Sequence, residues 1–208
     1  MKRKIDIQTW SRKAHYEFFN TFEEPFYGVC VNVDCQTAYE QAKLLNTSFF
    51  IYYLYQSIKA VNATEAFCYR LENDEVYLYE SINAGTTIDR EDGTFGFGYI
   101  PYDADYHIFE VAALAEINKV RSSVNLDTGP ERHNVIHYSS LPWLNFTSLS
   151  HARHFSKKES IPKITFGKVT IVNGRRQMPV SIHVHHALVD GRQIGEYVDT
   201  FQQFLNEK

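Results

Sequence analysis

Four stretches of the chain repeat apolar residues at the spacing of an α-helix, three to four positions apart. They cover residues 11–20, 47–62, 105–122 and 192–205. The last is the clearest, because its apolar positions all fall on one side of a helix: Ile194, Val198, Phe201 and Leu205. Ser11 stands where a helix-capping residue is preferred. We therefore predict four helices, with Ser11 capping the first.

Other stretches are rich in apolar residues and alternate with polar ones, as half-buried strands do. One pair, 67–71 and 75–79, flanks a short turn, and a second pair, 164–172 and 177–185, flanks Asn173-Gly174. Asn-Gly between alternating runs is the strongest short hairpin signal. Shorter strands are predicted at 27–33, 135–138 and 144–146, and the glycine-rich stretch 85–98 is either a loop or a set of bulged strands. Because helices and strands mix without regular alternation, we predict an α+β fold, a two-layer sandwich with a mixed sheet.

Length and composition narrow the possible functions. A chain of 208 residues is most simply one domain, 1–208. Its net charge of −4 provides no basic surface, so we expect no nucleic-acid partner. The longest apolar run, 49–55, is far shorter than the ~20 residues of a membrane span, and residues 5–8 do not form the apolar part of a secretory signal. The unpaired cysteines Cys30, Cys35 and Cys68 fit buried thiols in a reducing, cytoplasmic environment.

The most informative segment is 183–191, His-Val-His-His-Ala-Leu-Val-Asp-Gly, which ends a strand and opens the last helix. His186 follows the regular alternation of this strand, so that a turn can present it in a cleft. An imidazole there can remove a proton from a hydroxyl group at neutral pH. Asp190 precedes the helix and Gln193 stands at its third position, which resembles a capping box.

Two alternatives compete for the polar residues near His186. His183 and His185 lie on one face of the strand, so they could ligate zinc, with an oxygen from Asp190. No second cluster with ligand spacing accompanies them, so we favour packed or hydrogen-bonded imidazoles and expect no metal. Ser148 could act through its hydroxyl, but no Gly-x-Ser-x-Gly elbow surrounds it, and a hydrolase nucleophile is not supported.

Several segments, in order along nearly the whole chain, resemble the chloramphenicol acetyltransferase family, which uses coenzyme A. The signature His-His-x-x-x-Asp-Gly at 185–191 resembles that of its acyltransferase fold. The other similar segments are Trp-Ser-Arg-Lys-Ala-His-Tyr-Glu-Phe-Phe at 10–19, Thr94-Phe95, Pro101-Tyr102, Pro-Trp-Leu-Asn-Phe-Thr-Ser at 142–148, Thr-Phe-Gly-Lys at 165–168 and the strand from Met178. Dihydrolipoyl acyltransferase cores and peptide-synthetase condensation domains share related signatures but come with extra domains or about twice this length. The resemblance therefore implies a chloramphenicol acetyltransferase-like fold.

The resemblance also implies roles for individual residues. His186 would be the general base for direct attack of an acceptor hydroxyl on acetyl-CoA, and Ser148 would stabilise the oxyanion. Thr165 would support the same intermediate, and Asp190 would pair with Arg12 to hold the His186 loop. Lys168, with Thr165, would lie along the coenzyme. The implied acceptor-pocket residues are Phe18, Phe19, Tyr27, Phe95 and Asn145. The family forms trimers, with His186 from one subunit and much of the acceptor pocket from its neighbour.

Some positions depart from the family's pattern on the acceptor side. Val169 follows Lys168 where the family usually has Tyr. Glu159-Ser160 precedes Ile161-Pro162 where better-known members have an aromatic pair before Ala-Pro, in a segment that helps to form their apolar acceptor pocket. The sequence therefore predicts an O-acetyltransferase acting on chloramphenicol or a similar small acceptor. The alternatives are a same-fold acyltransferase with another acceptor and a catalytically idle trimeric scaffold.

Overall fold

The computed structural model describes residues 1–126, 129–154 and 159–208. The helices within them are α1 (Lys13–Phe19), α2 (Gln36–Leu44), α3 (Phe49–Ala63), α4 (Tyr106–Arg121) and α5 (Gly191–Leu205), with a 3₁₀ turn at Glu65–Cys68. The strands are β1 (Lys2–Lys4), β2 (Phe26–Asp34), β3 (Tyr69–Glu72), β4 (Glu75–Tyr79), β5 (Asn83–Asp89), β6 (Phe95–Ile100), β7 (Val135–Ser140), β8 (Lys163–Phe166), β9 (Thr170–Val172) and β10 (Arg175–His185). None of the helices in these residues is both long and apolar enough to cross a bilayer.

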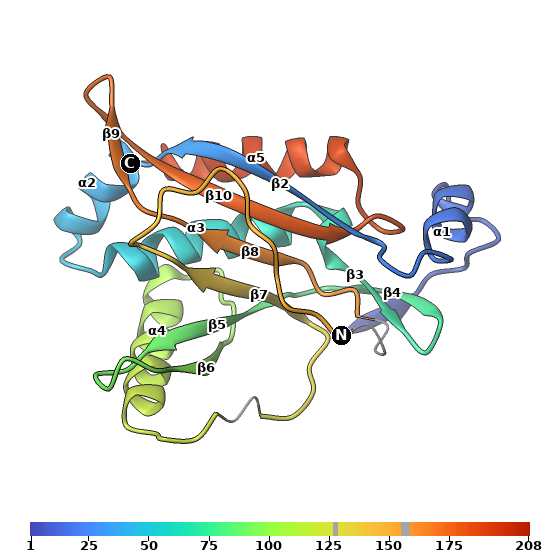
Figure 1. The fold of residues 1–208 in the computed structure, drawn as a ribbon, viewed down its shortest axis with the longest axis horizontal. Coiled ribbons are helices and arrows are strands. Elements are labelled where there is room, and N and C mark those ends of the chain that lie inside the picture. The colour runs from blue at the N-terminus through green and yellow to red at the C-terminus, as the bar shows by residue number, and fades with distance from the viewer. Residues whose placement is uncertain (127–128, 155–158) are drawn as a thin grey trace.

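The main sheet is mixed, and helices cover one of its faces. Its strand order is β2-β10-β8-β7-β5-β6, with β9 paired to β10. β7 runs parallel to both β5 and β8, whereas the other pairs are antiparallel. α2, α3, α4 and α5 lie behind this sheet in Figure 1, and α1 lies beyond the ends of β2 and β10. The predicted α+β class with a mixed sheet is confirmed.

Alternation along β10 separates an apolar face from a polar one. Val180, Ile182 and Val184 are fully buried on the face covered by helices. Ser181, His183 and His185 point to the opposite face, as the alternation predicts. No helix covers that face in the part of the chain that the structure describes, and the segment 141–154 crosses it instead (Figure 1).

Both predicted hairpins are present, and each has a two-residue turn. β3 and β4 pair through Glu72 and Glu75, and the two residues between them have positive φ angles, Asn73 at 51° and Asp74 at 64°. At the second hairpin, Asn173 has φ 50° and Gly174 has φ 77°. Two central residues with positive φ define the type I′ turn, which suits the twist of paired strands.

Several predicted elements need correction. The strand at 144–146 is wrong, because this segment is irregular. The strand at 164–172 is broken into β8 and β9 at Gly167, where a Cβ atom would lie 2.6 Å from Pro179 and 2.8 Å from the Leu144 carbonyl oxygen. Arg12, not Ser11, occupies the N-cap of α1, which has no side-chain cap.

Four elements escaped the prediction or were left open. α2 and β1 were not predicted, and the ambiguous stretch 85–98 contributes to both β5 and β6. Residues 67 and 68, predicted as the start of a strand, belong to the 3₁₀ turn.

A fully buried arginine, Arg70, fixes the start of β7 by donating to the carbonyl oxygens of His133 and Val135 at 2.7 and 2.6 Å.

Candidate active site

The turn that carries His186 is held by backbone and side-chain hydrogen bonds. The carbonyl oxygen of His185 accepts from the amides of Leu188 and Val189 at 2.9 and 3.0 Å, and its ring Nδ1 accepts from the Ala187 amide at 3.3 Å. The amide of His186 donates to the carbonyl oxygen of Pro25 at 2.8 Å. The position of His186 is therefore fixed by main-chain contacts on both of its sides.

The His186 ring lies against two aromatic rings that were predicted to line the pocket. It stacks on Phe19, with centroids 3.8 Å apart and planes 6° from parallel, and lies 4.3 Å from the Tyr27 ring. Its Nδ1 is buried and has no hydrogen-bond partner among the described residues. Phe18 lies beside Phe19, at 5.0 Å between centroids, and remains 60% exposed. Three of the five predicted pocket residues therefore gather around His186.

An ion pair closes the other end of the turn. Arg12 Nη1 donates to Asp190 Oδ2 at 2.8 Å, and the two side chains are 13% and 29% exposed. Asp190 also caps α5 by accepting from the Arg192 amide, and Gln193 completes the predicted capping box. Burial would raise the pKa of Asp190, but the hydrogen bonds from Arg12 and the Arg192 amide lower it. Asp190 is therefore an ionised carboxylate that joins α1 to the His186 turn.

Tyr27, whose ring lies against that of His186, stays protonated. Burial, followed by the charge of Asp190, raises the pKa of Tyr27 to about 12, while Arg12 opposes the shift. Its hydroxyl is buried without a hydrogen-bond partner among the described residues. The site around His186 thus holds a neutral phenol beside a charged pair.

Thr165 lies in a different part of the sheet. It is 1% exposed on the polar face, opposite Ser181 of β10 and Ser139 of β7. Ser181 precedes His185 by four residues, which corresponds to about 13 Å along a strand. Within one chain, about 13 Å of strand therefore separates the position of Thr165 from the end of β10 that leads to His186.

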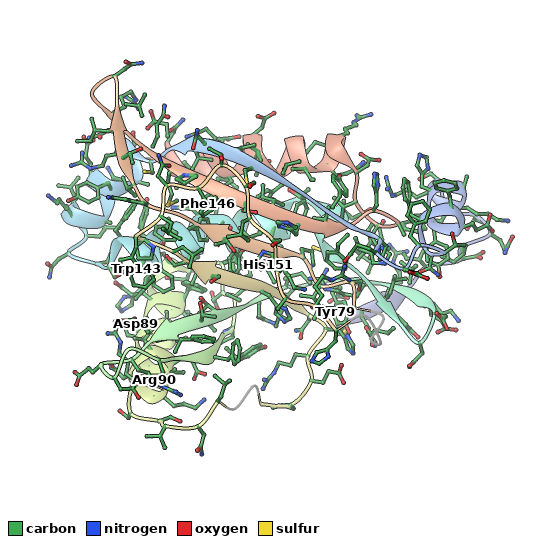
Figure 2. All side chains as sticks on the ribbon, viewed as in Figure 1. Tyr79, Asp89, Arg90, Trp143, Phe146 and His151 are labelled. Carbon is green, nitrogen blue, oxygen red and sulfur yellow. The ribbon has the colours of Figure 1, made fainter. Side chains whose placement is uncertain are left out.

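The other predicted site residues lie on other segments of the chain. Ser148 and Asn145 are exposed in the segment 141–154, along which Figure 2 shows Trp143, Phe146 and His151. Lys168 is exposed, and its amide donates to the Leu144 carbonyl oxygen at 2.8 Å. Phe95 is on β6, at the opposite edge of the sheet from β2, about 24 Å away at ordinary strand spacing.

The remaining histidines of β10 are packed and hydrogen-bonded. Burial lowers the pKa of His185 to about 4, with Arg153 adding to the shift. His183 Nδ1 lies 3.2 Å from Ser181 Oγ, and its ring meets the His151 ring at 90° and 4.8 Å. Across residues 1–126, 129–154 and 159–208, no three His, Cys, Asp or Glu side chains are grouped as metal ligands.

Sequence reasoning missed the residues that attach the segment 141–154 to the sheet. Arg153 forms an ion pair with Glu24 and lies 3.8 Å above the Phe26 ring. His183 lies across Gly28, where a Cβ atom would be 2.3 Å from its Nε2. No local pattern marks these contacts, because the partners are more than 100 residues apart. The pairing of β2 with β10 brings Gly28 to His183.

Comparisons with known proteins agree with one another. The family model described as chloramphenicol acetyltransferase matches residues 2–202. A chloramphenicol acetyltransferase of Bacillus pumilus is 29% identical over 96% of this chain and 91% of its own length. Chloramphenicol acetyltransferase 3 of Escherichia coli is 28% identical over 99% of this chain and 97% of its own.

Solved structures give the same result. One chloramphenicol acetyltransferase superposes with a TM-score of 0.87 and 31% identity, covering 99% of this chain and all of the other. A dihydrolipoamide acetyltransferase of Azotobacter vinelandii shares the fold with a TM-score of 0.67 at 13% identity, covering 93% and 86% of the two chains. With the signature at 185–191 folded into an anchored turn, the chain belongs to the chloramphenicol acetyltransferase family of enzymes.

Proposed function

We propose that this chain transfers the acetyl group of acetyl-CoA to a hydroxyl group of chloramphenicol or a similar small acceptor. The observation that carries the proposal is the placement of His186, which stacks on Phe19 in a turn held by the Arg12–Asp190 pair. A base must be held at a fixed position relative to the proton that it removes. Membership of the family supports the same reaction.

His186 acts as the general base in this proposal. Its Nδ1 is buried, so Nε2 is the nitrogen that takes the proton from the acceptor hydroxyl. The acceptor oxygen then attacks the thioester carbonyl carbon and forms a tetrahedral intermediate. When the carbon–sulfur bond breaks, the imidazolium returns its proton to the sulfur, and coenzyme A leaves as the thiol. No bond between the enzyme and the acetyl group forms.

Three further side chains would act on the intermediate and the coenzyme. Ser148 donates a hydrogen bond to the oxyanion, an interaction that is strongest in the transition state. Loss of one such donor typically lowers turnover by about 10²–10³. Thr165 supports the intermediate through water, and Lys168 lies along the coenzyme. Asp190 takes no proton and acts through Arg12, which fixes the turn.

Such a site requires more than one copy of the chain. His186 and Thr165 of one chain are separated by about 13 Å of strand, which supports a site to which two subunits contribute. We propose a homotrimer with active sites between subunits, functioning in the cytoplasm. Analytical ultracentrifugation of the purified protein tests the trimer directly.

Coenzyme A release from acetyl-CoA, measured with and without chloramphenicol, tests the reaction. His186→Ala should lower acceptor-dependent release by about 10²–10⁴ without changing the melting temperature. The matched control is His107→Ala, because the His107 side chain on α4 is 82% exposed. Retention of most of the rate by His186→Ala would refute the assignment of the base.

Mixed trimers test the shared site. His186→Ala and Ser148→Ala chains are each nearly inactive alone, but a mixed trimer can place an intact His186 beside an intact Ser148. With random mixing of equal amounts in a cyclic trimer, about a quarter of the interfaces are intact. Activity that stays at the level of the two parents after remixing would rule out a site between subunits.

Two outcomes would favour the alternatives. His186-dependent release with other alcohols and not with chloramphenicol would indicate a same-fold acyltransferase with a different acceptor. No release with any alcohol would leave an idle trimeric scaffold, which would have no physical reason to hold Arg12, Asp190 and His186 together.

A further inference from the structure

The face of the sheet that the segment 141–154 crosses carries polar residues in two rows across the strands. Strand register aligns the first row, His137 of β7, Lys163 of β8, His183 of β10 and Gly28 of β2. It aligns the second row as Ser139, Thr165, Ser181 and Cys30. Glu159 and His151 join the first row from the segments beside it. We call His137, His151, Glu159, Lys163 and His183 the polar wall.

A buried ion pair stands at the centre of the polar wall. Lys163 Nζ donates to Glu159 Oε1 at 2.6 Å, and His137 Nδ1 lies 3.5 Å from the same oxygen. The Lys163 side chain is only 9% exposed. Burial would raise the pKa of Glu159, but hydrogen bonds from His137 and Lys163 hold it at about 2. The Lys163–Glu159 pair is therefore charged, although it is largely buried on this face of the sheet.

Two buried polar atoms beside this pair lack hydrogen-bond partners among the described residues. They are Thr165 Oγ1 and His151 Nε2. Native proteins rarely leave buried polar atoms unpaired, so each of these atoms is available to a water molecule or to a ligand group. Thr165 itself is 1% exposed. The face around Thr165 thus has unused hydrogen-bonding capacity next to a charged pair.

We propose that the polar wall selects a neutral, polyhydroxylated acceptor, such as a small sugar or polyol. This inference rests on the proposed function, which places Thr165 beside the reacting hydroxyl. Lys163 precedes Thr165 by two residues on β8, which places it about 7 Å away, within reach of a second hydroxyl on the same small molecule. One hydroxyl of this acceptor takes the acetyl group by the mechanism above, and the others bind the wall.

The chemistry of the wall favours this class of acceptor over an apolar ring. Lys163 and Glu159 together carry no net charge, and they offer both donors and an acceptor, as hydroxyl groups require. An apolar ring over the pair would remove its remaining hydration and provide no hydrogen bonds in return.

The test compares acetylation of methyl β-glucoside, sorbitol and chloramphenicol by the wild-type protein and by Lys163→Met/Glu159→Gln. This double variant removes both charges at similar volume and leaves no uncompensated buried ion. The matched control is Lys59→Met/Glu207→Gln, which removes an exposed pair with a 2.9 Å contact on the helical side. A His186→Ala sample run in parallel identifies enzyme-dependent turnover.

We expect kcat/KM for at least one polyol to fall tenfold or more in the double variant, and that for chloramphenicol to stay equal or rise. Turnover of chloramphenicol but of neither polyol by the wild type would overturn the inference and leave the proposed function intact. An equal effect on both acceptor classes would also overturn it. No His186-dependent turnover of any acceptor would overturn the proposed function itself. If the double variant does not fold, Lys163→Gln/Glu159→Gln provides the comparison, since it also removes both charges and leaves no uncompensated buried ion.

Discussion

The Arg12–Asp190 pair provides the sharpest test of how the His186 turn is held. Asp190 accepts hydrogen bonds from Arg12 Nη1 at 2.8 Å and from the Arg192 amide at 3.0 Å. Asp190→Ala removes both interactions, Asp190→Asn keeps an oxygen for the amide and loses the charge, and Arg12→Met leaves the carboxylate in place. Arg12→Met, Asp190→Asn, the double variant Arg12→Met/Asp190→Asn and the wild type are the four proteins of a mutant cycle for the ion pair, and the comparison of Asp190→Ala with Asp190→Asn isolates the cap.

The structure sets the expected magnitudes. Loss of a helix N-cap typically costs about 1 kcal/mol of unfolding free energy. Removing one partner of a fully buried pair costs about 3–5 kcal/mol. Because the Asp190 side chain is 29% exposed, water and salt screen the interaction, and about 1–3 kcal/mol is the appropriate range here. Asp190→Ala should therefore destabilise the protein more than Asp190→Asn, by about 1 kcal/mol.

Urea unfolding of the four proteins, followed by tryptophan fluorescence, measures the coupling free energy, and coenzyme A release measures the rate. We expect a coupling of about 1–2 kcal/mol and a fall in turnover in every variant, because the His186 turn loses an anchor. The native pKa of Asp190 is lowered, so the contribution of this carboxylate is present above its unfolded value near 3.9 and is lost as the pH falls further. Coupling below about 0.3 kcal/mol, or wild-type turnover in Arg12→Met, would refute the anchoring role.

The other predictions concern buried groups. Because the folded pKa of His185 is about 4, protonation of the unfolded chain should remove up to about 3 kcal/mol of stability between pH 6.5 and 4, and His185→Asn should flatten urea-unfolding profiles in that range. Gly28→Ala should displace the His183 ring, which packs against the segment 141–154 that carries Ser148. This displacement should lower both kcat and the melting temperature, and an added His183→Ala should restore the melting temperature. Arg70→Met should cost about 3–5 kcal/mol in urea unfolding, since it leaves buried carbonyl oxygens unpaired; a loss below 1 kcal/mol would contradict this.

The elements that the sequence predicted well are those with strong local signals. The Asn173-Gly174 turn, the capping box at Asp190 and the apolar stripe of α5 each depend on residues within a few positions of one another. By contrast, the break at Gly167 arises from a close approach to Leu144 and Pro179, which no local pattern contains. The polar stretch at 36–44 hid α2, because few of its positions are apolar enough to show a helical period.

The candidate site likewise contains residues that the sequence predicted together and residues that only the folded sheet brings together. Local spacing and the family resemblance placed Arg12, Asp190 and His186 together, and the structure brings them within contact distance through α1 and the turn. The polar wall could not be predicted, because Lys163 stands in an apolar run that resembles a buried strand. Its partner Glu159 was noticed only as a departure from the family pattern. Pairing of β7, β8 and β10 is what converts isolated polar positions into a surface.

The separation between the His186 turn and the polar wall has a consequence for how this enzyme could change its acceptor. His186 is held by α1, by Pro25 and by the turn after β10, none of which contributes a side chain to the wall. Lys163 and Thr165 lie about 7 and 13 Å back along the sheet from His185, counted from the register with β10. Substitutions at Lys163 or Glu159 can therefore alter what the wall binds without moving the base. If the base and the wall meet only across a subunit interface, acceptor choice and proton transfer are under separate structural control, and variants of the wall should change KM before they change the pH dependence of kcat.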